Sequence, residues 1–268
     1  MHNNQFLSNN LLSNHAALKL FAIEEMFISN YQHKLLVTPV AEIGCKSTAT
    51  QGNYGQSMHK CATALQFLVS SALRVGVTTE ILCGTENAQF FETKNADVHK
   101  THDKITETNK FFYLKDFLAT SNADYVTIVD DVNLKIKRNP LSWHAVNFGK
   151  LALSAAQRDK PCISQNRMLC EKLMEFSSRK VIPDAVLNSF LSRPFVNSSV
   201  ISAKRDTLLE IMTLTCDLVS YISDSAESGL AAFNLAIQLS KIPYSIDTPF
   251  FMPMGVSAKD GCYWITKQ

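Results

Sequence analysis

The sequence predicts an α/β fold with a mixed, mainly parallel sheet flanked by helices, and three observations support this prediction. The chain opens with a strand, a helix and a second strand over residues 34–84, an order that normally gives a right-handed crossover between parallel strands. The apolar run Tyr125–Val129 is rich in β-branched residues and suits a strand buried on both faces of such a sheet. Further helical and strand-like segments follow to the end of the chain, which favours a layered α/β architecture.

The first half of the chain alternates between apolar segments and polar connections. Residues 58–75 carry apolar side chains at helical spacing, and Gly76 follows as a helix stop. An aromatic face marks a helix over residues 109–120, whereas residues 85–106 are polar and irregular. The elements expected here are a helix over 15–30, a strand over 34–40, a loop over 41–57, a helix over 58–75, a strand over 79–84, an irregular segment over 85–106, a helix over 109–120 and a strand over 125–129.

The second half is expected to contain mostly helices. Small polar residues mark the strand-like stretch 194–202, and the helix after it is rich in Leu, Ile and Met. The elements expected here are helices over 148–157, 167–177, 184–191, 204–222 and 225–240, and strands over 161–164, 194–202 and 243–251. Because the sequence contains no internal repeat or low-complexity linker, residues 1–268 are expected to form a single domain.

Composition sets further bounds on the kind of protein. The chain is 46% hydrophobic and 19% charged, an ordinary globular profile with enough apolar residues for a sizeable core. A net charge of +2 is too close to neutral to indicate nucleic-acid binding by itself. The seven cysteines form no C-x-x-C pair, which disfavours a zinc site and is typical of reduced core cysteines in a cytoplasmic protein. No window has 18 uninterrupted apolar residues, so no transmembrane segment is expected.

Two adjacent carboxylates follow the strand at Tyr125–Val129 directly. They are Asp130 and Asp131, and Asn133 stands two positions further on. Adjacent acids are costly inside a sheet layer unless something compensates them, but at the carboxyl end of a strand they can reach the edge where open α/β folds bind ligands. One interpretation is a hard divalent cation that carries phosphate oxygens. The other is a turn or the cap of a following helix.

Three segments, in this order, resemble the GT-A nucleotide-sugar glycosyltransferases, in particular those of the glycogenin and bacterial galactosyltransferase kind. The first is the strand–helix–strand opening over residues 34–83. The second is Asn109-Lys-Phe-Phe-Tyr-Leu-Lys115, followed by Tyr125-Val-Thr-Ile-Val-Asp-Asp-Val-Asn133 and Arg138-Asn-Pro140. The third, Pro194-Phe-Val-Asn-Ser-Ser-Val-Ile201, is similar to a family segment that lies near the donor sugar and the acceptor.

The resemblance implies a GT-A-like domain in which residues 30–140 form the nucleotide-binding part and residues 141–268 the acceptor-side part. It implies a hexosyl- or pentosyltransferase that moves a sugar from a nucleotide-sugar donor, first of all a UDP-sugar, to a glycan, lipid-linked or surface-polymer acceptor. It also implies a Mn²⁺ or Mg²⁺ ion at Asp131 and Asn133, which would neutralise charge on the leaving diphosphate. The donor contacts that it implies come from Thr38, Pro39, Lys110, Asp130, Asn197 and Ser198.

The chain departs from the family pattern at the metal motif. The family's Asp-x-Asp appears here as Asp-Asp-Val-Asn, and an amide can ligate a hard cation but adds no charge. Many relatives also use a late histidine as a metal ligand, whereas this chain has no histidine after His144. Asp224 and Glu227 are candidates for the general base of an inverting enzyme, and both also suit the N-cap and first turn of a helix.

Alternatives remain open for the other assignments. Lys110 could face solvent from its helix, and Asn197 and Ser198 could satisfy backbone groups. A sugar nucleotidyltransferase is a rival function, although its Gly-rich loop appears only in a degraded form over residues 44–46. A glycosyltransferase-like binding or scaffold protein without catalysis is a second rival. A transferase acting on nucleic acid is a third, supported only by a basic patch over residues 135–138.

Overall fold

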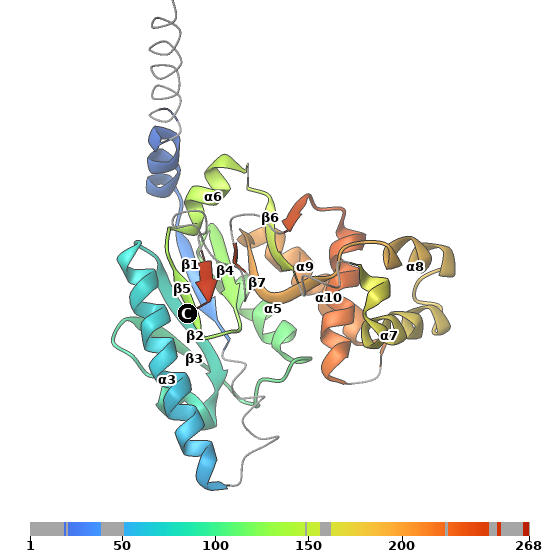
Figure 1. Ribbon diagram of the computed structural model, residues 1–268, viewed down its shortest axis with the longest axis horizontal. Helices are drawn as coiled ribbons and strands as arrows, with labels where there is room; N and C mark the ends of the chain where they lie inside the picture. Colours follow the sequence, from blue (N-terminus) through green and yellow to red (C-terminus); the bar gives the residue numbers. More distant parts are fainter. Residues whose placement is uncertain are drawn as a thin grey trace, which may run out of the picture.

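The computed structural model describes residues 19, 21–38, 51–147, 149–155, 162–222, 225–246, 251–252 and 265–267. Within these ranges, helices pack on both faces of a mixed, mainly parallel sheet, which confirms the α/β prediction (Figure 1). The predicted loop over residues 41–57 falls outside the described ranges up to residue 50, and this part includes the glycine-containing segment 44–46.

The main sheet has seven strands in the described part of the chain. They are β1 (His33–Val37), β2 (Thr78–Gly84), β3 (Ala96–Thr101), β4 (Tyr125–Val129), β6 (Leu151–Ala155), β7 (Val196–Lys204) and β8 (Tyr244–Ile246). Their spatial order is β3-β2-β1-β4-β7-β6-β8. β1 pairs in parallel with β2 and β4, and β2 with β3, whereas β7 runs antiparallel to its neighbours β4 and β6. The carboxyl ends of β1 and β4 therefore meet the amino-terminal end of β7 at one edge of the sheet.

A smaller sheet of three strands lies beside the main one in the described residues. It consists of β5 (Leu134–Ile136), β10 (Ile265–Lys267) and β9 (Phe251–Met252). β10 pairs antiparallel with β5 and parallel with β9, so the last described residues of the chain lie next to the segment that follows β4. This arrangement encloses Leu134, Ile136 and Ile265, which are all buried.

Several helices begin or end where the sequence provides a suitable residue. Asn139 caps α6 by accepting a hydrogen bond from the Leu141 backbone N–H, with Pro140 at the first helical position. Gly76 adopts a φ of 75° just after α3, a conformation that favours glycine. The described helices that follow β1 are α3 (Gln51–Arg74), α4 (Ala88–Phe91), α5 (Lys110–Thr120), α6 (Pro140–Val146), α7 (Arg167–Ser178), α8 (Asp184–Leu191), α9 (Arg205–Val219) and α10 (Ala226–Ser240), with short 3₁₀ helices at Thr85–Asn87 and Ile163–Gln165.

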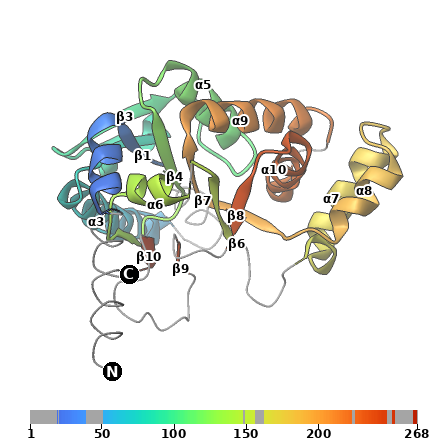
Figure 2. The same cartoon turned by 90° about the horizontal axis from the view of Figure 1, so that it is seen from above.

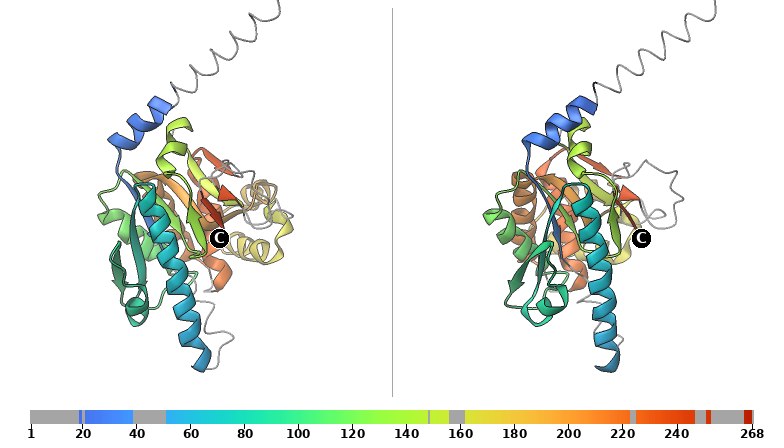
Figure 3. Two further views of the ribbon diagram at one scale, coloured as in Figure 1. Left: turned by 60° about the vertical axis from the view of Figure 1, so that its left-hand side comes forward. Right: turned by 90° about the vertical axis from the view of Figure 1, so that its left-hand side faces the viewer.

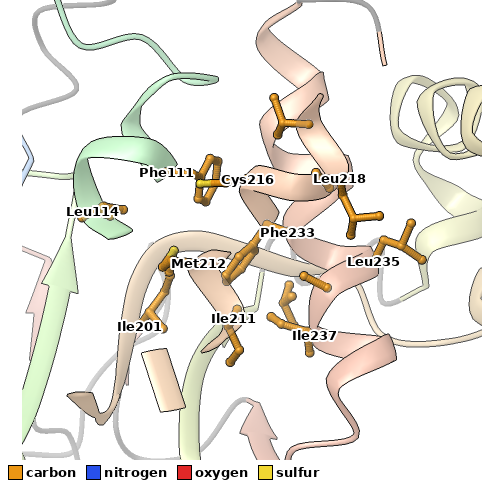
Figure 4. Packing of buried hydrophobic residues seen from close by; sticks show 14 of the residues in the cluster. Phe111, Leu114, Ile201, Ile211, Met212, Cys216, Leu218, Phe233, Leu235 and Ile237 are labelled. Carbon is orange, nitrogen blue, oxygen red and sulfur yellow. The ribbon is translucent and has the colours of Figure 1, made fainter. Parts of the chain in front are cut away.

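The sheet separates two hydrophobic cores. On one face, α3 and α6 cover β1, β2 and the small sheet, and on the other face α5, α9 and α10 cover β4 and β7 (Figure 2). In the second core, Phe111 of α5 stacks on Phe233 of α10 with ring centroids 5.7 Å apart. Met212 and Cys216 of α9 lie beside these rings (Figure 4). This packing fixes the position of α5, which carries Lys110 at its first turn.

A helix over residues 21–30 precedes β1 and extends away from the sheet (Figure 3). It is attached through Phe27, whose ring lies 5.5 Å from the ring of Tyr125 on β4. Phe21 and Met26 are exposed on it. Among the described residues, no helix combines the length and the apolar character that crossing a membrane requires.

Four predictions about local structure were wrong. Residues 148–157 were expected to be helical, but Leu151–Ala155 form β6, because pairing with β7 and β8 outweighs the helix propensity of Leu and Ala. Of the strand expected over 161–164, residue 161 lies outside the described residues and Cys162 forms only an isolated antiparallel bridge with Pro194, while a 3₁₀ helix begins at Ile163. The irregular segment over 85–106 contains the edge strand β3. The loop expected up to residue 57 is helical from Gln51, where α3 begins.

Candidate functional site

The carboxyl edge of β1 and β4 brings together residues that are far apart in the sequence. Thr38 follows β1, and its backbone N–H donates to the carbonyl of Val129 at 2.9 Å. Asp130 follows β4, and its N–H donates to the carbonyl of Ser199 on β7 at 3.1 Å. Because β7 is antiparallel to β4, its first residues lie at this same edge, which is the edge where open α/β sheets bind ligands.

Lys110, at the start of α5, is the centre of a buried ionic cluster at this edge. Its Nζ donates to Asp130 Oδ2 at 2.9 Å, to Glu107 Oε2 at 2.7 Å and to Ser198 Oγ at 3.1 Å. These contacts use all three hydrogens of the ammonium group. Lys110 is 2% exposed and Asp130 is 9% exposed, so the pair is held in the interior and not on a solvated helix face. We call Glu107, Lys110, Asp130 and Ser198 the Lys110 cluster.

The Lys110 cluster carries more negative than positive charge. Burial by itself would lower the pKa of Lys110, but the attraction of Asp130 and Glu107 outweighs it and raises this pKa, so the ammonium stays charged. Burial raises the pKa of Asp130, and repulsion from Glu107 and Asp131 raises it further, while Lys110 opposes the change. Two carboxylates therefore face one ammonium, and Asp131 adds a further negative charge beside Asp130, which makes this edge of the sheet favourable for a positive charge.

Asp131 and Asn133 form a turn immediately beyond β4. Asp131 Oδ1 accepts a hydrogen bond from the Asn133 backbone N–H at 2.9 Å and one from Asn133 Nδ2 at 3.3 Å. Asn133 therefore presents its NH₂ group to the carboxylate, whereas joint ligation of a cation would need its carbonyl oxygen there. In this conformation the two residues do not fit a shared cation. Within the described residues, no group of three or more His, Cys, Asp and Glu is arranged to hold a metal.

The two residues expected to contact sugar hydroxyls have different surroundings. Ser198 Oγ belongs to the Lys110 cluster. The side-chain carbonyl of Asn197 accepts a hydrogen bond from the Ser199 backbone N–H at 3.0 Å, which fits the alternative that it satisfies a backbone group. Thr38 is 2% exposed, and its hydroxyl has no hydrogen-bond partner among the described residues. A buried hydroxyl without a partner is costly, so Thr38 is a point where a ligand group would be favourable.

Glu227 lies in the first turn of α10, and this helix begins beside the Lys110 cluster. The Thr108 hydroxyl donates to the carbonyl of Ser225, the N-cap residue of α10, at 2.8 Å. Further along the helix, a Cβ on Gly229 would lie 2.6 Å from the carbonyl oxygen of Glu107. Glu227 is partly exposed, as a first-turn residue favoured by the helix dipole would be. The other two predicted site residues, Pro39 and Asp224, lie outside the described residues.

Glu107 is the member of the cluster that sequence reasoning missed. It stands three positions before Lys110, a spacing at which oppositely charged side chains meet on a helical turn. This spacing was the available signal, but it occurs in most proteins by chance. The other charge partner of Lys110, Asp130 just after β4, lies 20 positions away and comes into contact only when α5 packs on the sheet.

Comparison with protein-family models and with curated proteins identifies no relative. The chain matches no protein-family model, and no curated protein matches it. The geometry of the carboxyl edge therefore carries the functional interpretation.

Proposed function

We propose that this chain is a nucleotide-sugar glycosyltransferase of GT-A type, which transfers a sugar from a nucleoside-diphosphate donor to a glycan or glycolipid acceptor. The observation that carries the proposal is the buried contact of Lys110 with Asp130 and Ser198. It joins the start of α5, the end of β4 and the start of β7, which are the segments that the resemblance assigns to the donor. Thr38 adds a fourth position at the same edge through its contact with Val129.

In this proposal Lys110 supplies positive charge to the leaving diphosphate. A phosphate oxygen would replace Ser198 Oγ as an acceptor, because this is the longest of the three contacts and the only one to a neutral group. A preorganised ammonium stabilises the charge that develops as the bond between the sugar and the diphosphate breaks. The carboxylates of Asp130 and Glu107 would keep Lys110 in position through the reaction.

The remaining roles are assigned by position. The Thr38 hydroxyl would contact the nucleoside, and Glu227 would accept the proton of the acceptor hydroxyl in an inverting reaction. Binding of Mn²⁺ or Mg²⁺ at Asp131 stays a prediction. Asn133 would have to rotate its side chain so that the amide oxygen, and not the NH₂ group, faces the ion. We also propose a cytoplasmic location, which is supported by Cys162, Cys170 and Cys216, since none of them forms a disulfide within the described residues.

A thermal-shift screen tests the proposal directly. UDP-, GDP-, CMP- and dTDP-sugars are added with and without Mn²⁺ to wild type, to Asp131→Ala and to Asp97→Ala, an exposed carboxylate on edge strand β3. A ligand that binds only the folded state raises the melting temperature, so one donor is expected to raise it in wild type and in Asp97→Ala but not in Asp131→Ala. If no donor raises the melting temperature of wild type, the proposal is wrong.

A non-catalytic, glycosyltransferase-like binding protein is the second candidate. Two observations favour this candidate. Asp131 and Asn133 bond to each other in a turn, and the Lys110 ammonium already has three acceptors from the protein. The two candidates differ in turnover. If a donor binds in the thermal-shift screen, the release of its labelled sugar to water or to an acceptor is then measured for wild type and for Lys110→Met. A transferase would release sugar faster than Lys110→Met does. A binding protein would release it no faster than this variant.

A further inference from the structure

A pocket on the α3 face of the protein has no role in the proposed reaction. It lies where the end of α3 packs against β5, and its volume is about 370 Å³. α3 and β5 lie side by side in Figure 3. The pocket is lined by Ser71, Arg74, Val75, Lys135, Ile136, Lys137 and Arg138.

Four of the lining residues are cationic and none is acidic. The cations come from two separate elements, Arg74 from α3 and the other three from β5 and the residues after it. Arg74, Lys135 and Lys137 take part in no ion pair among the described residues. Because the whole chain has a net charge of only +2, this is a strong local concentration of positive charge that an anion would stabilise.

The framework of the pocket is held by its own hydrogen bonds. Ser71 Oγ accepts from the Ile136 backbone N–H at 2.9 Å and donates to the Leu68 carbonyl at 2.8 Å. Asn139 Nδ2 donates to the Val75 carbonyl at 3.2 Å. The α3 terminus is thus joined to β5 and to the segment after it, and the cations project from a fixed surface.

The four cationic side chains are not needed to balance the partial negative charge at the carboxyl end of α3. Backbone N–H groups after α3 already cap its last turn, since Val77 donates to the Ala72 carbonyl at 3.0 Å and Gly76 to the Leu73 carbonyl at 3.1 Å. With the Val75 carbonyl bonded to Asn139, these carbonyls need no cationic partner. The Arg74 guanidinium and the Lys135 and Lys137 ammonium groups are therefore available to a ligand from solvent.

We propose that this pocket binds a small ligand that carries two or more phosphate groups. Arginine and lysine are the side chains that proteins use for phosphate oxygens, and the volume lies within the range of small-molecule sites. Four cations gathered in one pocket suit a small polyphosphate better than a nucleic acid, which needs a track of cations along its backbone. The inference does not depend on the glycosyltransferase proposal.

The pocket is distinct from the Lys110 cluster. Arg74 ends α3 just before β2 begins at the amino edge of the sheet, whereas Thr38 and Asp130 follow the carboxyl ends of β1 and β4. A diphosphate could therefore bind at both places. The test must separate them.

Inorganic pyrophosphate is the probe, and isothermal titration calorimetry measures its dissociation constant at constant ionic strength. The proteins are wild type, Arg74→Gln/Lys135→Gln, Asp131→Ala and the control Arg193→Gln, an exposed arginine in the turn between α8 and β7. Loss of two phosphate contacts is expected to weaken binding by about tenfold or more in the double variant, because each charge-assisted hydrogen bond contributes substantially. Asp131→Ala and Arg193→Gln are expected to bind as wild type does.

Several outcomes would overturn the proposal. One is the absence of pyrophosphate binding to wild type, and another is equal affinity of wild type and the double variant. Tighter binding in Asp131→Ala, as removal of a nearby negative charge would produce, would assign the anion to the carboxyl edge instead. A single-stranded oligonucleotide that binds more tightly than pyrophosphate, with the same loss in the double variant, would replace the small ligand by nucleic acid. Thermal unfolding of the double variant, expected to match wild type, excludes misfolding as the cause.

Discussion

Thr127 of β4 and Ser202 of β7 lie opposite each other in the sheet, and their hydroxyl oxygens are 2.6 Å apart in a hydrogen bond. Each hydroxyl also contacts a buried histidine. His33 Nε2 lies 2.8 Å from Thr127 Oγ1, and His144 Nε2 lies 2.8 Å from Ser202 Oγ. Four polar side chains therefore form a continuous buried chain from β1 across the sheet to α6, in surroundings that disfavour a charged imidazole.

This buried chain predicts that the protein loses stability in mild acid. Burial lowers the pKa of His33 to about 3, and burial together with repulsion from His33 lowers the pKa of His144 to about 3, from an unfolded value of 6.5. Because the folded pKa values are depressed, the contribution to stability is full above pH 6.5 and is lost as pH falls from 6.5 towards 3. At about pH 5 each histidine is expected to lower the free energy of unfolding by about 2 kcal/mol.

Urea unfolding between about pH 7.5 and about pH 5 measures this loss and stays above the range in which carboxylates dominate. His33→Gln removes one of these two buried histidines, so the dependence on pH that they cause should fall by about half. His102→Gln, at an exposed histidine, should leave it unchanged. A free energy of unfolding that does not vary over this range would contradict the prediction.

Lys110 and Asp130 should be strongly coupled in stability. Lys110→Met leaves Asp130 buried beside Glu107 with no cation, and breaking a buried pair in this way costs about 3–5 kcal/mol. In Lys110→Met/Asp130→Leu the uncompensated charge at Asp130 is also removed. The double variant should therefore be less destabilised than the two single variants added together.

A double-mutant cycle in urea measures the coupling, and an exposed ion pair provides the control. Arg167 is 91% exposed in its pair with Glu171, so Arg167→Met should cost far less than Lys110→Met. If Lys110→Met costs no more than Arg167→Met, the Lys110 cluster is not held as the structure describes.

The sequence predicts the centre of the sheet better than its edges, and the reason is burial. β4 lies between two layers of the protein, so all five of its residues are buried and the apolar run is easily recognised. β3 has one parallel neighbour and an alternating, largely polar surface, so its residues resemble a loop. β6 contains Leu, Ala and Ser, which suit a helix as well as a strand, and only its pairing with β7 and β8 decides the outcome.

The same distinction applies to the candidate site. The sequence predicts Lys110, Asp130 and Ser198 as site residues because each lies in a segment that resembles part of a known family. The contacts of Lys110 with Asp130 and Ser198 depend on the packing of α5 against the sheet, which brings together residues 20 and 88 positions apart that no local pattern links. The arrangement of Asp131 and Asn133 as a turn is local, and the sequence did allow it as one of two interpretations.

Gly229 is expected to be essential for the packing of α10 against α5. A Cβ at this position would lie 2.6 Å from the Glu107 carbonyl oxygen and 2.7 Å from Phe111 Cε2. Alanine in a helix gains about 1 kcal/mol over glycine, but the clash with backbone and a packed ring should outweigh this gain, so Gly229→Ala should destabilise by about 1–3 kcal/mol. The displaced segment carries Glu107, so Gly229→Ala should also weaken any ligand of the Lys110 cluster.

Substitution of Gly76 measures backbone strain without the steric clash expected at Gly229. It has a φ of 75° and no atom within 4 Å of a built Cβ, so Gly76→Ala should cost about 1 kcal/mol through the backbone alone. Asparagine tolerates this conformation, and Gly76→Asn should therefore recover part of the loss, whereas Gly229→Asn should be worse than Gly229→Ala. Thermal unfolding of the four variants checks this order, and a stable Gly229→Asn would contradict it.

Thr38→Val should separate stability from ligand binding. The Thr38 hydroxyl is buried with no partner among the described residues, so its replacement by a methyl group removes an uncompensated polar group. The free energy of unfolding should stay the same or rise by about 1 kcal/mol. If the hydroxyl contacts the nucleoside, binding of the donor found in the thermal-shift screen should weaken by about tenfold.

Thr79→Val is the matched control, because the Thr79 hydroxyl is also buried and has no partner in the described part of the chain. Thr79 lies near the start of β2, at the amino edge of the sheet, so its replacement should have the same effect on stability and none on the donor. Equal donor affinity in the two variants would remove Thr38 from the donor site. A large loss of stability in Thr38→Val would show instead that this hydroxyl has a protein partner, and its proposed contact with the nucleoside would then lose its physical basis.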